Sequence, residues 1–496
     1  MERKSYFVGV DIGTSNVVMA VGSRVGDGPI NIEDVISRPI ESGVTSGRID
    51  NVNSVGAAIS SAKEELEREL GIRINEAYAG ISGEFVRCAY HTDHVFVRNR
   101  ETGCISKEDM IALHERMNNV VPSDHGEVIL ERIPQNYIID NNHEIDNPIG
   151  SFGQTITSTF MFILCQNSQL ERVKMAFFNA GGLKLLGTYV NPTILPSLVL
   201  TEDEKDEGAA VVDIGGGTTD VAIVRGGKLR YIGSIPIGAQ TINNDMRSFG
   251  IPERKTEDTK RKYGSAIADK ISVDSTIPIH LAGQQSKKDL PHRNLVAIIE
   301  ARLKDIIEFT WTEIKHAKMS TKIPCGLVLT GGTTVLEHID ELFQSETNLP
   351  ARLSTIENGI SVDTKDMVST YSQSTAVAVM LKGASHCKCD VVEVNARGAV
   401  SPGVPPTPPI PPQPLRPTPP TTTGVPATPP AGSTPTPKPE ETTPKPTEQH
   451  TTETPSKPVD APQKQEKKSG KKLGGFLNGM SKLLDAVLGN DKDDVL

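Results

Sequence analysis

The chain has 496 residues, so we expect more than one domain, because a single domain usually holds about 100 to 200 residues. Its formal net charge of −10 argues against a general nucleic-acid binder, since phosphate backbones are bound through clustered Lys and Arg. The six cysteines form no C-x-x-C pair of the kind that a structural zinc site needs. Neither a signal-peptide pattern nor a run of about 18 apolar residues occurs, so a cytoplasmic protein without a spanning helix is expected.

The first 390 residues alternate β-rich apolar runs with stretches of helical period, which indicates a mixed α/β body. Within it, residues 8–21 and residues 210–224 repeat one another. Each segment consists of an apolar strand, an Asp-Ile-Gly turn with small polar residues, and a second apolar strand. Each therefore predicts a β-hairpin with glycine and hydroxyl groups at its tip. The repetition predicts a duplicated architecture in which the two hairpins face each other across a cleft.

The two predicted hairpins carry groups that bind phosphate and Mg²⁺. Glycine lets backbone N–H groups approach a phosphate closely, and Thr or Ser hydroxyls add hydrogen-bond donors. Asp11 and Asp213 stand at matching positions before the turns, where a carboxylate can hold Mg²⁺ through water. The predicted phosphate-binding residues are Gly13, Thr14, Ser15, Gly215, Gly216, Gly217, Thr218 and Thr219.

A third glycine turn, in residues 326–335, follows an apolar strand and precedes a helix predicted over residues 336–343. Gly331 and Gly332 would allow the backbone to lie beside a flat nucleobase. The glycine patterns of P-loop and Rossmann sites are both absent from the sequence, which disfavours those two kinds of nucleotide site.

The composition of the chain changes near residue 396. Residues 401–462 hold 22 of the 35 prolines and no aromatic residue. Such a segment cannot bury enough apolar surface to offset its ordering entropy, so residues 391–466 are predicted to be a disordered, polyproline-biased linker. At full extension this linker could span on the order of 200 Å.

Residues 467–489 have the opposite character, because apolar side chains recur there at helical spacing and fall within an arc of about 140°. Four lysines precede them. The apolar residues are Leu473, Phe476, Leu477, Met480, Leu483, Leu484, Val487 and Leu488. The pattern predicts an amphipathic helix on an anionic membrane surface. The alternative is a helix that docks on the protein's own body, but the long linker and three helix-weakening glycines favour the membrane.

The three glycine turns together resemble the phosphate-1, phosphate-2 and adenosine motifs of the actin, Hsp70 and sugar-kinase superfamily. The matching segments are the Asp11 turn, residues 213–220 and residues 330–333. The resemblance implies an ATP-binding cleft and adds Thr333 to the adenosine contacts.

In the same superfamily an E-x-x-K pattern on a helix lines the adenosine pocket, and Glu257 with Lys260 is similar to it. The resemblance therefore implies that both side chains contact the nucleotide. The alternative is an ordinary ion pair on the helix surface.

The stretch between the two hairpins resembles the FtsA family of bacterial cell-division proteins at residues 79–86, 133–140 and 145–150. The resemblance covers about residues 5–390 and extends to the terminal helix. It implies an α/β, actin-like duplicated ATPase fold with an FtsA-type 1C subdomain. The implied divisions are subdomain 1A in residues 1–83 and 164–208, subdomain 1C in 84–163, subdomains 2A and 2B in 209–390, the linker in 391–466, the membrane-targeting helix in 467–489 and an acidic tail in 490–496.

Similarity to this family implies ATP and Mg²⁺ as cofactors and a role as a membrane-associated adaptor. Such a protein would polymerise on the cytoplasmic face of the inner membrane at the division site, anchor filaments of the tubulin-like FtsZ, and recruit later division proteins. Lys288 and Arg302 fall where the family places basic residues for the acidic C-terminal peptide of FtsZ, with solvated surface charge as the alternative. An actin-like pilus scaffold and an Hsp70-like ATPase are the alternative functions.

The sequence departs from the family pattern in two places. The linker is longer and richer in proline than in relatives. Asn191 stands where actin-like ATPases present Glu or Gln to orient the attacking water. The shorter amide would displace that water by about 1 Å, which can lower a rate around 10²-fold. Asp213 and Asn191 are the candidate catalytic residues, and any ATP hydrolysis is expected to be slow.

Overall fold

The structure is a computed structural model of the chain, and it describes residues 4–40, 42–273, 275–280, 287–368 and 371–393. Two five-stranded sheets have the same strand order, β12-β7-β1-β2-β3 in the first half and β19-β18-β13-β14-β15 in the second. The strands of the first sheet are β1 (Lys4–Ile12), β2 (Asn16–Val25), β3 (Asn31–Pro39), β7 (Glu76–Ile81) and β12 (Lys184–Val190). Those of the second are β13 (Ala209–Ile214), β14 (Thr219–Arg225), β15 (Lys228–Ile235), β18 (Leu327–Thr330) and β19 (Ala351–Leu353).

The strand directions are also duplicated. β1–β2–β3 and β13–β14–β15 are antiparallel meanders, whereas β7 and β12, like β18 and β19, run parallel to the first strand of their sheet. The two predicted hairpins at residues 8–21 and 210–224 are therefore confirmed. The central strands are almost continuously apolar because both of their faces are buried.

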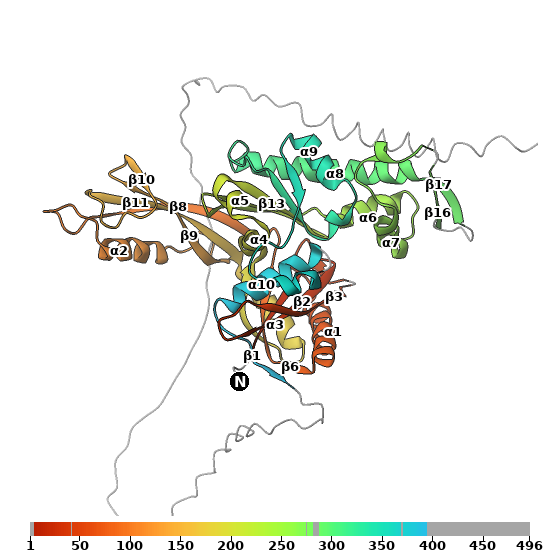
Figure 1. Ribbon diagram of the computed structural model, residues 1–496, viewed down its shortest axis with the longest axis horizontal. Helices are drawn as coiled ribbons and strands as arrows, with labels where there is room; N and C mark the ends of the chain where they lie inside the picture. Colours follow the sequence, from red (N-terminus) through yellow and green to blue (C-terminus); the bar gives the residue numbers. More distant parts are fainter. Residues whose placement is uncertain (1–3, 41, 274, 281–286, 369–370, 394–496) are drawn as a thin grey trace, which may run out of the picture. The chain divides into compact units, whose positions relative to one another are not determined.

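Helices cover both faces of the first sheet (Figure 1). They are α1 (Val52–Leu70), packed against α3 (Asn167–Asn179), and α10 (Ser374–Ala384), packed against α4 (Asn191–Val199). The helix α10 approaches β1 so closely that a Cβ atom on Gly9 would lie 2.5 Å from the carbonyl oxygen of Ala376. Only glycine fits at that crossing.

The second half carries its own helices and core. The helices are α5 (Glu202–Glu207), α6 (Ala239–Ser248), α7 (Glu253–Tyr263), α8 (His292–His316) and α9 (Ile339–Thr347), and a two-stranded sheet is formed by β16 (Thr276–His280) and β17 (Lys287–Pro291). One face of α8 buries Leu295, Ile299, Leu303 and Ile306 in this core at the spacing of an amphipathic helix.

A four-stranded sheet is inserted between β7 and α3, with strand order β10-β9-β11-β8 (Figure 1). Its elements are β8 (Val86–Phe96), α2 (Lys107–Asn118), β9 (Glu127–Ile139), β10 (His143–Ile145) and β11 (Thr155–Gln166). The helix α2 packs on β8 and β11 and begins at a capping box formed by Ser106 and Asp109. Two small cores of its own, around Leu113 and Phe160, hold this unit together.

Two short strand pairs complete the fold, β4 (Val44–Thr45) with β5 (Arg48–Ile49), and β6 (Ile72–Ile74) with β20 (Val391–Glu393). The second pair corrects the predicted start of the linker at residue 391. Val391 and Val392 continue the folded body because β6 offers them an open strand edge, with Val391 opposite Ile74.

Candidate functional site

The turns of the two long hairpins lie against each other. In each turn the first glycine donates its N–H to the carbonyl three residues later, at 3.0 Å from Gly13 and 2.9 Å from Gly215. A Cβ atom on Gly216 would lie 2.2 Å from Ser15 Oγ, so a side chain at that position would have to displace the Ser15 side chain of the opposite turn. The two repeats, which were predicted to face each other across a cleft, meet at their tips.

A cavity of about 100 Å³ lies between the turns. Of the residues predicted from the sequence, it is lined by Asp11, Gly13, Thr14, Ser15, Asn191, Asp213, Gly215, Gly216, Thr218, Gly331 and Gly332. Lining residues that were not predicted are Ile12, Asn16, Val18, Gly47, Ser82, Asp220, Ser372 and Thr375. The structure thus brings three separate glycine turns to one place.

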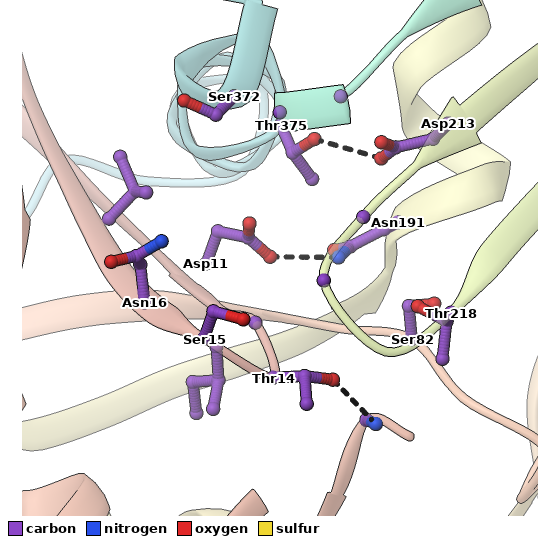
Figure 2. Close-up of a pocket in the computed structure, with 18 of the residues that line it drawn as sticks. Asp11, Thr14, Ser15, Asn16, Ser82, Asn191, Asp213, Thr218, Ser372 and Thr375 are labelled. Carbon is purple, nitrogen blue, oxygen red and sulfur yellow. Dashed lines mark hydrogen bonds between the residues drawn. The ribbon is translucent and has the colours of Figure 1, made fainter. Parts of the chain in front are cut away.

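Each hairpin carboxylate receives a hydrogen bond from the first turn of a helix (Figure 2). Asn191 begins α4 and donates from Nδ2 to Asp11 Oδ1 at 2.8 Å. Thr375 lies in the first turn of α10 and donates from Oγ1 to Asp213 Oδ2 at 3.2 Å. The duplication therefore extends from the sheets to the polar contacts of the site.

Three buried carboxylates share this cavity. Burial raises the pKa of Asp11 to about 7, the pKa of Asp213 to about 8 and the pKa of Asp220 to about 6. The negative charge of Asp220 raises the pKa of the other two further. Carboxylates that are buried together repel one another, and a bound cation relieves that repulsion.

The residues present fit a cation held through water. Asn191 Oδ1 is buried and has no hydrogen-bond partner among the residues described, so it can accept from a water molecule. The described part of the chain has no group of three or more His, Cys, Asp or Glu side chains placed to ligate a metal directly. Mg²⁺ commonly keeps several of its water ligands, and the polar groups of this site can hydrogen-bond to such waters.

Ser82 is a site residue that the sequence reasoning missed. It follows β7, and its Oγ donates to Asp220 Oδ2, which joins the first half of the molecule to the second. Asp220 lies on β14 directly opposite Asp213. Asp220 could have been predicted from the sequence, because it is the last residue of the glycine motif that begins at Asp213. No local signal marked Ser82, because its partner is far away in the chain.

Three of the residues predicted in the glycine turns do not line the cavity. Thr219 Oγ1 donates to the carbonyl of Ile237 at 2.8 Å, and Thr333 Oγ1 donates to the carbonyl of Gly215 at 3.3 Å. Gly217 packs on Thr14 of the opposite turn, where a Cβ atom would lie 2.7 Å from the Thr14 hydroxyl. These residues hold the turns in shape.

The third glycine turn contacts the second carboxylate. Gly331 has φ 93°, and a Cβ atom there would lie 2.3 Å from Asp213 Oδ1. The helix predicted over residues 336–343 begins later, at Ile339, because His338 has φ 63° and cannot belong to a right-handed helix. A single 3₁₀ turn over Gly332–Val335 takes its place after the glycines.

Glu257 and Lys260 lie on α7, outside the lining of the cavity. The Lys260 side chain is buried, with Nζ 2.7 Å from Glu257 Oε2 and 3.1 Å from Asn243 Oδ1 on α6. Burial raises the pKa of Glu257, but Lys260 and Asn243 oppose that effect and lower it to about 2. The pair therefore ties α6 to α7.

The two predicted partner-binding residues lie in different surroundings. Lys288 lies on β17 opposite Ile279, and its side chain is outside the described part of the structure. Arg302 lies on α8 and donates to both oxygens of Asp245, at 2.7 and 3.0 Å, and to Asp305 at 3.0 Å. An acidic peptide would have to compete with these two carboxylates for the Arg302 guanidinium.

The linker from residue 394 onward and all eight predicted membrane-contacting residues, Leu473 to Leu488, lie outside the described residues. Among the helices that the structure does describe, none combines the length and the apolar character needed to cross a membrane.

Comparison with known families matches two parts of the chain. A family described as "Cell division protein FtsA" matches residues 210–378, and one described as "SHS2 domain inserted in FTSA" matches residues 83–164. The structure of a PilM–PilN type IV pilus biogenesis complex is similar with a TM-score of 0.53 and 15% identity, covering 76% of this chain and 98% of that one. This likeness and the two sheets of equal order establish an actin-like fold.

Similar proteins cover most of the chain. Cell division protein FtsA of Pseudomonas aeruginosa is 30% identical over 385 residues, which is 76% of this chain and 88% of that protein. Cell division protein FtsA of Escherichia coli strain K12 is 28% identical over 410 residues, which is 80% of this chain and 94% of that protein. With its inserted sheet and its paired glycine hairpins, this chain belongs to the FtsA family of cell division proteins.

Proposed function

We propose that the chain binds ATP with Mg²⁺ between its two hairpins and acts in cell division as a membrane-associated, polymerising adaptor. The observation that carries the nucleotide proposal is the pair of touching glycine turns, each preceded by a buried carboxylate. Two such turns, built alike in two sheets of equal order, form a two-sided cradle. A single glycine turn would leave the ligand open to water on one side.

The chemistry of the cradle suits a polyphosphate with its cation. Backbone N–H groups of both turns, and the N-terminal ends of α4 and α10, provide partial positive charge for the phosphates. Mg²⁺, held through water by Asp11 and Asp213, would neutralise the buried carboxylates. The cavity of about 100 Å³ holds only the phosphate end, so the sugar and base would extend past Gly331 and Gly332.

Gly216→Glu tests this assignment. The new side chain would meet Ser15 and place a carboxylate where the phosphates belong, so the affinity for Mg²⁺–ATP should fall at least about tenfold, or about 1.4 kcal/mol in binding free energy. Isothermal titration calorimetry of the full chain measures this change.

Gly28→Glu is the matched control, since it introduces the same side chain at an exposed glycine in the turn between β2 and β3. This variant should bind ATP as the wild type does. Equal ATP affinity in all three proteins would rule out the cradle as the nucleotide site.

The adaptor part of the proposal is supported by family membership and by the pattern of the C-terminal segment. The chain would polymerise on the cytoplasmic face of the inner membrane, hold FtsZ through its acidic C-terminal peptide near Lys288 and Arg302, and recruit later division proteins. The subdomain boundaries derived from the sequence are part of the same proposal. A pilus scaffold or an Hsp70-like ATPase is less favoured, because relatives at 28–30% identity over most of the chain are cell division proteins.

A further inference from the structure

We propose that a cluster of polar contacts around Gln135 couples the inserted sheet to the nucleotide site, so that occupancy of the site changes the orientation of that sheet. The inference rests on the proposed function, because the signal it transmits is the binding of Mg²⁺–ATP. It explains the Ile-Pro-Gln segment at residues 133–135, which the nucleotide site leaves without a role.

The inserted sheet and its helix α2 can move together as a rigid unit. The buried residues of its two small cores, around Leu113 and Phe160, all lie within residues 97–164. It is rooted through β8 and β11, because Val86, Met161, Ile163 and Cys165 belong to the large core that the two five-stranded sheets share. A unit with its own core and a narrow root can rotate without unfolding.

Gln135 fastens this sheet to β15 of the second half. The side-chain Nε2 of Gln135 donates to the backbone carbonyl of Leu229 at 3.0 Å. The backbone carbonyl of Gln135 accepts from Arg230 Nη1 at 3.0 Å and from Lys228 Nζ at 3.3 Å. Lys228 Nζ also lies 2.7 Å from Asp146 beside β10. We call Gln135, Lys228, Leu229 and Arg230 the clasp. The Gln135 side chain is buried, so these bonds have few competitors in water.

The clasp is a polar contact that can rearrange. Within the described residues, no backbone hydrogen bond joins β8 or β9 to β15. Further bonds between these strands run from Arg230 Nη1 to Gln135 Oε1 at 3.4 Å and from the side chains of Cys88 and Tyr90 to the carbonyls of Ile232 and Arg230. A cavity of about 730 Å³ lies along the contact. Two sheet edges joined by side chains around a cavity shift at lower cost than a packed core.

The clasp lies one strand away from the nucleotide site. β15 pairs with β14, which carries Asp220, and β14 pairs with β13, which carries Asp213. The bond from Ser82 to Asp220 connects the same carboxylate to the root of the inserted sheet. A ligand that changes the spacing of the two hairpins moves β15 relative to the first half, and the clasp transfers this movement to β9.

The experiment measures the orientation directly in the full chain. Spin labels are attached to non-natural residues at Glu108 on α2 and Gln344 on α9, two exposed positions on the inserted sheet and the second half. Pulsed electron resonance gives the distance distribution with and without Mg²⁺–ATP. In the wild type, the nucleotide should shift the mean distance by about 3 Å or more.

Gln135→Ala removes the side-chain bond to Leu229, and Arg230→Ala removes the guanidinium bond to the backbone carbonyl of residue 135, so each should reduce the shift. The double variant keeps only the Lys228 bond to that carbonyl and should reduce the shift most. ATP affinity, measured in parallel, should stay within about threefold of the wild type, because neither residue lines the cradle. Gln154→Ala is the matched control, since it removes an exposed glutamine from the inserted unit, and it should keep the full shift.

A full shift in the double variant would overturn the inference, as would a wild type that binds ATP without any shift. If the double variant does not fold, Arg230→Ala decides by the same criterion, because its side chain is half-exposed. Absence of ATP binding by the wild type would overturn the proposed function together with this inference, so the two failures are distinguishable.

Discussion

Asn191 and Thr375 have equivalent positions in the two halves, since each donates a hydrogen bond from a helix N-terminus to the carboxylate that precedes a glycine turn. The amide of Asn191 is therefore already engaged with Asp11. Only its Oδ1 is left to accept a hydrogen bond from an attacking water. A glutamine or glutamate would reach further into the cleft, and this difference bears on the rate of hydrolysis.

We predict that ATP turnover by the wild type is below about 1 s⁻¹, at the low end of the usual enzyme range. The physical reason is that Asn191 is short and holds Asp11, so it places the attacking water poorly. Steady-state phosphate release with the full chain measures the rate. Turnover faster than this limit would show that another residue positions the water.

Asn191→Ala separates the two roles of this residue. If it mainly orients Asp11, KM for Mg²⁺–ATP should rise several-fold with little change in kcat, whereas a lower kcat at constant KM would indicate water positioning. Asn179→Ala removes an exposed amide from α3 and should leave both constants unchanged.

At the scale of elements, β17 and α8 place Lys288 and Arg302 in the second half. The Arg302 guanidinium is hydrogen-bonded to Asp245 and Asp305, which compensates its charge within the chain. Breaking such a pair leaves carboxylates without partners, and that cost opposes any new contact. Lys288, on the hairpin β16–β17, is therefore the better candidate for direct contact with an acidic peptide.

We predict that Lys288→Glu weakens binding of the FtsZ C-terminal peptide at least about tenfold, because charge reversal repels an acidic ligand. Arg302→Lys should change the affinity less than about threefold, since the charge that faces Asp245 is kept. Fluorescence anisotropy with a labelled peptide, repeated at higher salt, measures both effects.

Lys388→Glu reverses the charge of an exposed lysine of the first half and serves as the control. If Arg302→Lys weakens binding as strongly as Lys288→Glu, the planar guanidinium group of Arg302 must itself bind the peptide.

At the scale of the whole molecule, the sequence joins a body that the structure describes as far as Glu393 to a long proline-rich segment and a terminal amphipathic pattern. The sequence pattern predicts a membrane contact in residues 467–489. Burial of eight apolar side chains would provide several kcal/mol at roughly 25 cal/mol per Å², offset by the ordering of a helix that contains glycine. A single tail is therefore expected to bind weakly, and a polymer would bind tightly by avidity of about 10² or more.

We predict that Phe476→Asp combined with Leu484→Asp abolishes membrane binding, because two charges enter the middle of the apolar arc. Co-sedimentation of the full chain with liposomes of anionic lipid measures binding, and fluorescence microscopy shows whether the variant reaches the division plane.

Gly475→Asp combined with Asn478→Asp adds the same charge to the polar side of the predicted helix and should bind liposomes far better. Pelleting and correct localisation of the Phe476 and Leu484 variant would instead favour a helix that docks on the protein's own body.

The sequence by itself determined the features that depend on neighbouring residues. The Asp-Ile-Gly turns, their duplication and the carboxylates Asp11 and Asp213 were predictable because glycine turns and apolar strands are local, and a repeat is visible in one dimension. The three glycine turns were also predicted to form one site, and they do.

The tertiary structure alone decided which side chains meet. Ser82 with Asp220, Thr375 with Asp213 and Gln135 with β15 are contacts between residues far apart in the chain, and they depend on the order of strands in two sheets. The same reason explains why the bonds of Thr219, Thr333 and Lys260 to their own chain were not predicted. A residue's type shows what it can bind, whereas the packing of distant strands and helices determines which partner lies within reach.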